Sequence, residues 1–201
     1  MLKVGLTGGL ACGKSFVGEA LARYGCFVIR ADELGHEVLA PGGEAYDSVI
    51  QEFGSEIVDA GGRIDRRRLA ARVFGDPQAL VRLNALVHPP VVRREEQLMA
   101  DFASREPKGI AVVEGAILVE TGSYRRFDRL VLVTCSEEQQ LHRAMHRDAV
   151  TEEEARVRLS RQMPLAEKRK FAHFVIDTSG AKEDTLRQAR AVYEELRRIE
   201  A

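Results

Sequence analysis

The chain has 201 residues, 45% hydrophobic and 30% charged, a composition typical of a globular protein with a sizeable core that excludes a disordered or fibrous chain. Its 30 basic residues nearly balance 31 acidic ones, so the formal net charge of −1 gives no general argument for binding nucleic acid. The apolar runs fall far short of the roughly 20 residues that span a membrane, so we expect no membrane partner. Three widely spaced cysteines with no CxxC pair predict free thiols and a cytoplasmic location.

The start of the chain predicts a strand, a glycine-rich turn, a helix and a second strand. Residues 3–7 are apolar enough for a short buried strand, and residues 16–21 then follow a helical period. A further apolar run at 26–29 precedes Asp32 and a second helical pattern. This order is typical of an α/β unit, so we expect the two strands to run parallel in one sheet.

The next apolar run that suits a buried strand is 110–114, so more than a normal crossover separates it from the second strand. Helical apolar spacings fill much of the gap, with Asp76-Pro77 as a helix start and His88-Pro89-Pro90 as a break. Residues 57–65 suggest a turn between two short extended pieces. We therefore expect residues 60–108 to form a mainly helical insertion on the α/β core.

Residues 130–133 and 174–176 complete a set of five predicted strands. The segment between them is rich in basic residues, and capping patterns at Ser136 and Thr151 predict two helix starts. A final amphipathic helix is expected from about residue 182 to residue 198. Residues 1–201 are thus expected to form one α/β unit, a five-stranded parallel sheet with helices on both faces.

One motif carries specific chemistry. Residues 8–15 are GGLACGKS, which matches the phosphate-binding pattern GxxxxGK[ST] in its proper place between a strand and a helix. Backbone N–H groups of such a turn converge on phosphate oxygens, and the helix that follows adds the positive end of its dipole. Lys14 would then bridge the β- and γ-phosphates of a nucleotide, and the Ser15 hydroxyl would bind Mg²⁺. The alternative is a glycine turn with an incidental lysine.

Two carboxylates lie at the carboxyl ends of predicted strands, Asp32 just after the second and Glu114 as the last residue of the third, where the ligands of open α/β sheets bind. Asp32 would accept the proton of an acceptor hydroxyl, or would only cap the next helix. Glu114 would order the shell of a magnesium ion through water, or would face solvent as an ordinary strand end. Glu120 is a further candidate in the same region.

The basic segment predicts a mobile lid. Arg143 and Arg147 lie four residues apart and would share one helix face, although solvated surface is the more common role of any single arginine. Several arginines that close over ATP would stabilise the charge on the transferring phosphoryl group and exclude water. His88 would position a substrate, or would lie at a helix end with its ring hydrogen-bonded.

The phosphate-binding motif alone fits several classes of protein. A GTP-binding switch needs an NKxD motif, and the single asparagine of this chain, Asn84, is followed by alanine. A motor or assembly ATPase should end its apolar strand in an acidic pair, whereas Glu114 is followed by Gly115. A small-molecule kinase needs an acceptor-binding insertion and an arginine-rich lid, and both are predicted here.

Motifs along nearly the whole chain resemble those of the dephospho-coenzyme A kinase family. In the first half these are VGLTGG at 4–9, GKS at 13–15, Ala31-Asp32, GRIDR at 62–66 and His88-Pro89. In the second half they are Cys135-Ser136-Glu137, Arg143, Arg147-Asp148, QMPL at 162–165 and VID at 175–177. Many families share the phosphate loop, but the ordered set is much more specific.

The resemblance implies that ATP, with Mg²⁺, phosphorylates the ribose 3′-hydroxyl of dephospho-coenzyme A, the last step of coenzyme A synthesis. It implies Asp32 as general base and Lys14 and Arg143 as further catalytic residues. The ATP-binding residues would be Gly8, Gly9, Ala11, Cys12, Gly13, Lys14, Ser15, Phe16, Arg143 and Gly180. The acceptor would contact Asp32, Arg66, His88, Glu120 and Arg147, with the insertion at 60–108 as acceptor region and 137–170 as lid.

The chain departs from the family's pattern in a few places. Residues 116–120 are AILVE where a PLLFE-like stretch is usual, His173 stands where Asp is usual, and Thr178 stands where Asn is usual. These changes concern the acceptor and adenine contacts more than the reaction. Phe16, where Ser or Thr is common, is expected to pack against the sheet.

A kinase of the same fold that acts on another nucleoside, nucleotide or small alcohol is the alternative function. The partner expected in either case is a small-molecule substrate, with no nucleic acid. The chain is expected to act as a monomer or a small homo-oligomer.

Overall fold

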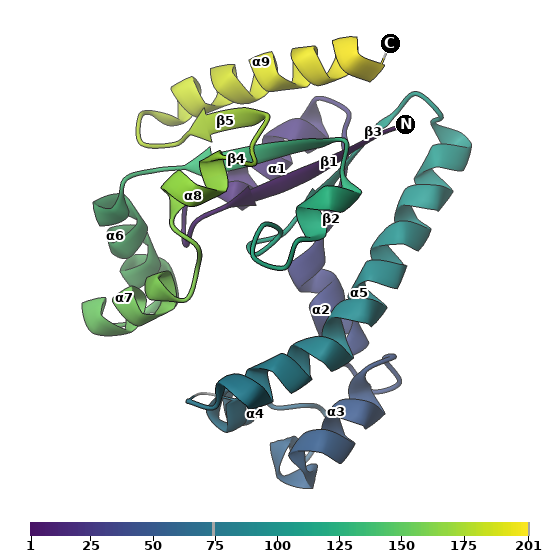
Figure 1. Cartoon of the computed structure of the whole chain (residues 1–201), viewed down its shortest axis with the longest axis vertical. Coiled ribbons are helices and arrows are strands. Elements are labelled where there is room, and N and C mark those ends of the chain that lie inside the picture. The colour runs from purple at the N-terminus through teal and green to yellow at the C-terminus, as the bar shows by residue number, and fades with distance from the viewer. Residues whose placement is uncertain (74, 201) are drawn as a thin grey trace. The chain divides into compact units, whose positions relative to one another are not determined.

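The computed structural model describes residues 1–73 and 75–200 and divides the chain into two compact units, which Figure 1 shows in one view. The first unit joins residues 1–30 to the residues from 101 onward, and the second unit is residues 31–100. Among the described residues, no helix combines the length and the apolar character needed to cross a membrane. The division into an insertion at 60–108 and a lid at 137–170 is functional and stays a prediction.

The first unit is built on a parallel five-stranded sheet, which confirms the predicted fold class. Its strands are β1 (Leu2–Gly8), β2 (Phe27–Arg30), β3 (Ile110–Glu114), β4 (Arg129–Thr134) and β5 (Phe174–Asp177), in the order β2-β3-β1-β4-β5. In register, Leu6 of β1 lies between Glu114 of β3 and Val131 of β4. The carboxyl ends of the strands therefore share one edge, where ligands of such sheets bind.

Apart from the exposed Lys3, the central strand β1 is buried on both faces, which explains why its sequence is mainly apolar and does not alternate with charged residues. One face packs against α1 (Lys14–Arg23) and α9 (Lys182–Glu200), where Leu21 and Leu196 are fully buried. On the other face, a Cβ on Gly5 would come within 2.8 Å of the Phe127 ring, so a larger residue would force the ring away. Figure 1 shows α1 behind the sheet and α8 (Leu165–Arg169) in front of it.

The basic segment forms three short helices, α6 (Glu137–Asp148), α7 (Glu152–Ser160) and α8. Both predicted helix starts are confirmed. Ser136 Oγ accepts a 3.2 Å hydrogen bond from the Gln139 amide, and Thr151 forms a complete capping box with Glu154. A 3₁₀ turn, η2 (Ser123–Arg126), precedes β4.

The second unit is mainly helical. It contains α2 (Ala31–Val38), α3 (Tyr46–Phe53), the 3₁₀ turn η1 (Ser55–Ile57), α4 (Arg66–Val73) and most of α5 (Pro77–Arg105). An antiparallel bridge between Val58 and Ile64 confirms the predicted turn between two extended pieces. Val49, Phe53 and Leu69 are among its buried side chains.

The predicted helix break at His88-Pro89-Pro90 is wrong, because α5 continues through both prolines. Proline has no backbone N–H, so the carbonyls one turn earlier, at Ala85 and Leu86, lose their usual donors. If the next turn is held in place by packing, the loss of these two hydrogen bonds bends the helix but does not end it. Pro90 and Val91 are buried, and Figure 1 shows a bent α5.

Candidate active site

The glycine-rich turn leaves β1 and leads into α1, as the motif predicts. Ala11 and Gly13 have φ values of +52° and +80°, the left-handed region that turns the chain sharply. A Cβ on Gly8 would come within 2.5 Å of the Val133 carbonyl oxygen, and one on Gly9 within 2.3 Å of Gln140 Oε1. Gly13 caps α1 without a side-chain hydrogen bond, so the first amides of α1 keep their preference for an anion.

Lys14 and Ser15 begin α1 and lie beside the end of β3. Lys14 Nζ donates a 3.2 Å hydrogen bond to the Gly9 carbonyl, which places its ammonium over the turn. Ser15 Oγ donates a 2.7 Å hydrogen bond to Glu114 Oε1. Glu114 is only 8% exposed, so it is not an ordinary solvent-facing strand end.

The Ser15 and Glu114 oxygens fit a hard divalent cation. Glu114 Oε2 is buried without a hydrogen-bond partner, and Arg30 Nε lies 3.9 Å from it. Mg²⁺ in kinases is typically held by one or two protein oxygens together with water and substrate phosphates. A hydroxyl and a carboxylate next to a phosphate-binding turn are such a set.

Arg143 on α6 is joined to the turn through Thr178. Its guanidinium donates to Thr178 Oγ1 (3.0 Å) and to the Thr178 carbonyl (2.7 Å). Thr178 Oγ1 in turn lies 2.9 Å from the Cys12 carbonyl oxygen, to which it donates. Thr178 therefore connects Arg143 of α6 to the loop. Gly180 lies two residues further on, in the exposed approach to α9.

Three other residues singled out in the sequence have mainly structural partners. We expected Phe16 to pack against the sheet, but it is half-buried and is not part of the hydrophobic core there. The centre of its ring lies 6.0 Å from Lys182 Nζ of α9. Arg147 is exposed and pairs with Asp148 at 2.8 Å. His173 Nδ1 accepts a 3.0 Å hydrogen bond from the Leu130 amide, which ties the start of β5 to β4.

Lys168 on α8 also belongs to the ordered set of residues that resembles the family, but sequence reasoning gave it no role in the site. It is fully buried, and its Nζ donates to the Ala116 carbonyl (2.9 Å) and the Gly8 carbonyl (3.2 Å). It also forms a 2.8 Å ion pair with Glu120, whose Oε1 accepts the Met163 amide at 3.1 Å. The bonds join α8 to the start of the phosphate loop. No local pattern marks Lys168, because these carbonyls lie 52 and 160 residues away in the sequence.

Replacing Lys168 by methionine should lower the free energy of unfolding by about 3 kcal/mol, because it leaves the Glu120 carboxylate and two carbonyls without their cation. Urea unfolding followed by circular dichroism measures the loss. Lys170→Met is the matched control, since Lys170 is two-thirds exposed and pairs only at the surface with Glu167. Equal stability of the two variants would contradict this assignment. Adding Glu120→Gln to Lys168→Met should restore part of the loss.

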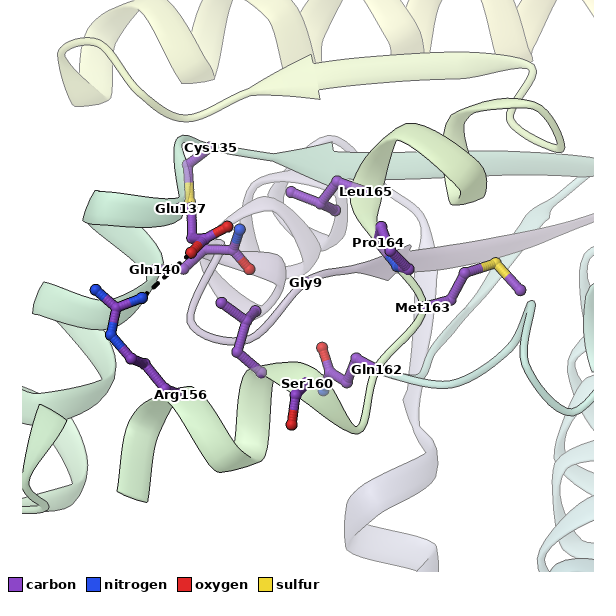
Figure 2. Close-up of a pocket in the computed structure, with 11 residues that line it drawn as sticks. Gly9, Cys135, Glu137, Gln140, Arg156, Ser160, Gln162, Met163, Pro164 and Leu165 are labelled. Carbon is purple, nitrogen blue, oxygen red and sulfur yellow. Dashed lines mark hydrogen bonds and ion pairs between the residues drawn. The ribbon is translucent and has the colours of Figure 1, made fainter. Parts of the chain in front are cut away.

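A cavity of about 590 Å³ lies beside the phosphate loop, within the size range of ligand pockets. Its walls come from Gly9, from the residues after β4 and from the segment that ends α7 and begins α8. Figure 2 shows these side chains around the open space, with the ion pair of Glu137 and Arg156 (3.5 Å) at one side. The amide oxygens of Gln140 and Gln162 are buried there without a hydrogen-bond partner, so the cavity offers two acceptors to a ligand.

Three of the predicted site residues belong to the second unit. Asp32 is exposed in the first turn of α2, which begins at Ala31, so Asp32 is not the N-cap residue that the alternative interpretation required. Arg66 is exposed at the first position of α4. His88 lies half-buried in the middle of α5, and burial lowers the pKa of its imidazole.

The chain is similar to known proteins over nearly all of its length. The model of the dephospho-CoA kinase family matches residues 2–184. The dephospho-CoA kinase of Aquifex aeolicus (strain VF5) is 37% identical over 198 residues, which are 98% of this chain and 99% of that protein. The crystal structure of TT1252 from Thermus thermophilus matches with a TM-score of 0.81 and 34% identity over 97% of each chain. The dephospho-CoA kinase from Campylobacter jejuni matches with a TM-score of 0.73 and 25% identity over 99% of this chain and 98% of that one.

Proposed function

Because the chain belongs to the dephospho-CoA kinase family, it is a kinase, and we propose that it transfers the γ-phosphoryl group of ATP to the ribose 3′-hydroxyl of dephospho-coenzyme A. The observation that carries the proposal is a phosphate loop held by hydrogen bonds on two sides, at Glu114 and at Thr178. Enzymes catalyse phosphoryl transfer mainly by positioning and by electrostatic stabilisation. A loop fixed in this way supplies the positioning.

The positive charges near the loop would act on the nucleotide. Lys14 would contact the β- and γ-phosphates, and Arg143 would face the same phosphates from α6. Both would stabilise the charge that spreads over the transferring group, an effect that grows when a lid excludes water. The other loop residues would bind phosphate oxygens through their backbone N–H groups.

Asp32 would accept the proton of the attacking hydroxyl. It follows β2 by two residues, and the last residue of β2, Arg30, lies opposite Glu114 in the register of the sheet. Arg66, His88, Glu120 and Arg147 would contact the acceptor. Since burial lowers the pKa of His88, its ring would be neutral near pH 7 and would recognise the acceptor by hydrogen bonding and not by charge.

Bound Mg²⁺ would neutralise phosphate charge during the transfer. Ser15 would bind the ion, and Glu114 would orient the Ser15 hydroxyl or a water of the magnesium shell. Glu114→Gln should therefore raise the Mg²⁺ concentration for half-maximal rate by about 10- to 100-fold, the usual cost of losing such a supporting carboxylate. A magnesium titration at saturating ATP measures this shift.

Glu19→Gln is the matched control for that titration, because Glu19 is an exposed carboxylate on α1. An unchanged magnesium requirement in Glu114→Gln would show that Glu114 acts only as a structural partner of Ser15. Removal of Mg²⁺ with a chelator should stop turnover in every variant.

The substrate is tested by ADP release with ATP and dephospho-coenzyme A, beside adenosine, AMP and water as acceptors. We expect turnover at a useful rate only with dephospho-coenzyme A. If adenosine or AMP served as well, the alternative of a kinase with another nucleoside or nucleotide acceptor would replace this proposal. Product identification by mass spectrometry would establish the 3′ position.

The three cysteines are free thiols, which supports the proposal of a reducing, cytoplasmic location. The oligomeric state, a monomer or a small homo-oligomer, stays a prediction.

A further inference from the structure

Two thiols face each other beneath the phosphate loop. Cys12 belongs to the loop and Cys135 follows β4, 123 residues away in sequence. Their sulfur atoms lie 3.3 Å apart, with the Cys135 thiol donating to Cys12 Sγ. Both side chains are free and buried, at 0% and 8% exposure. Sequence spacing gave no sign of this pair.

We propose that Cys12 and Cys135 form a site of reversible oxidative modification, at which a peroxide converts the two thiols to a disulfide and stops phosphate binding by the loop.

The surroundings make Cys12 the nucleophile of the pair. The hydrogen bond from Cys135 is the main cause that lowers the pKa of the Cys12 thiol to about 7, and the Lys14 ammonium acts in the same direction against the effect of burial. The pKa of Cys135 is raised by the same contact and by burial, so it remains a thiol. A thiolate next to a thiol is the arrangement that reacts with peroxides and then resolves to a disulfide.

The proposed reaction has two steps. The Cys12 thiolate attacks one oxygen of hydrogen peroxide, which breaks the O–O bond, releases hydroxide and leaves a sulfenic acid on Cys12. Cys135 then attacks that sulfur, and its proton leaves with the hydroxyl group as water. The two sulfur atoms together lose two electrons, and the peroxide takes them up.

A route for a small oxidant is present. Cys135 lies in the wall of the cavity in Figure 2, and so does Gly9. The position that a Cβ on Gly9 would take lies 3.0 Å from Cys12 Sγ and 2.3 Å from Gln140 Oε1, so the Gly9 backbone and the Gln140 side chain together cover the Cys12 sulfur there. Peroxide reaches the sulfur where Gln140, a flexible wall residue of the cavity, moves aside.

A disulfide would change the shape of the loop. A sulfur–sulfur bond is about 2.05 Å long, so the two side chains have to approach each other. Cys12 lies between the left-handed residues Ala11 and Gly13, and its carbonyl accepts the bond from Thr178. Formation of the disulfide would therefore displace Cys12 and the neighbouring backbone N–H groups, which have to be positioned to bind phosphate oxygens. This last step rests on the proposed function, whereas formation of the disulfide does not.

The test treats the full chain with a small excess of hydrogen peroxide and follows intact mass, free thiols and peptide-mapped disulfides under non-reducing conditions. We expect loss of two hydrogens, a Cys12–Cys135 link, and at least a 10-fold fall in turnover that dithiothreitol reverses. Excess ATP should slow the modification, because an occupied loop resists the movement.

Two variants separate the outcomes. Cys26→Ser should behave as the unsubstituted chain, since Cys26 lies in the α1–β2 connection and burial raises the pKa of its thiol to about 12. Cys135→Ser, compared with its own untreated activity, should form no disulfide and should accumulate a sulfenic acid on Cys12 that dimedone traps. A chain that keeps all three thiols, or a link through Cys26, would overturn the proposal. A mapped Cys12–Cys135 link with unchanged turnover would overturn the effect on the loop but not the modification site.

Discussion

Replacing Lys14 with alanine is expected to lower kcat by about 10²- to 10³-fold, the usual cost of removing one charged group that stabilises a transition state. In the structure the Lys14 ammonium lies over the turn, 3.2 Å from the Gly9 carbonyl. Because the lysine would contact phosphates in both the ground state and the transition state, ATP binding should also weaken. Steady-state ADP release and calorimetric ATP titration measure the two effects.

Lys3→Ala is the control for the Lys14 variant, since Lys3 is an exposed lysine on the strand that leads into the loop. It should leave both kcat and ATP affinity unchanged. The circular dichroism melting curve of each variant would show whether the fold is intact. A Lys14→Ala protein with normal melting and normal kcat would return the motif to its alternative, a glycine turn with an incidental lysine.

Local patterns were sufficient for much of the fold. The phosphate loop is encoded within residues 8–15, and its glycines are needed where a Cβ would meet Val133 and Gln140. The inner strands β1, β3 and β4 are mostly buried on both faces and give apolar runs, and the edge strands β2 and β5 give shorter runs, so all five could be found without knowledge of their neighbours. The capping box at Thr151 is also local, because its two hydrogen bonds join residues three apart.

The errors and omissions concern contacts that are distant in sequence. Whether Pro89 and Pro90 break α5 depends on what the next turn packs against, which a pattern of single residues does not contain. In the sequence, Lys168 does not differ from the basic residues around it, because its burial depends on distant contacts with Gly8, Ala116 and Glu120. The contact between Cys12 and Cys135 could not be predicted from local sequence either. The two residues follow β1 and β4, and they meet because these strands are neighbours in the sheet.

The site residues also fall into two classes, those whose position follows from a local motif and those whose position depends on contacts distant in sequence. The loop residues are fixed by a sequence motif together with a turn, so their place follows from the chain alone. The residues that hold the loop are Glu114 at the end of β3, Thr178 just after β5 and Lys168 on α8, three segments far from the loop in sequence. Substitutions in this second set should change the affinity for Mg²⁺ and ATP or the stability more than they change the chemistry.

Asp32→Asn is expected to lower kcat by about 10²- to 10⁴-fold, the contribution of a positioned general base. The asparagine keeps the size and the hydrogen-bonding reach of the side chain but cannot take up the proton of the 3′-hydroxyl. Because proton transfer occurs only in the transition state, the affinity for ATP should stay nearly the same. Turnover with saturating dephospho-coenzyme A gives kcat, and titration of ATP without acceptor gives the affinity.

Asp47→Asn distinguishes this role from a general effect of a negative charge at a helix start. Asp32 and Asp47 are both exposed aspartates in the first turns of helices of the second unit, α2 and α3, and each charge interacts favourably with a helix dipole. If Asp32 served only the helix, both variants would lose a similar small amount of stability and would keep full kcat. A loss of ATP affinity in Asp32→Asn would instead indicate that this carboxylate helps to hold the magnesium ion. A fall in kcat confined to Asp32→Asn, with ATP affinity unchanged and a loss of melting temperature no larger than that of Asp47→Asn, is the result that only a general base explains.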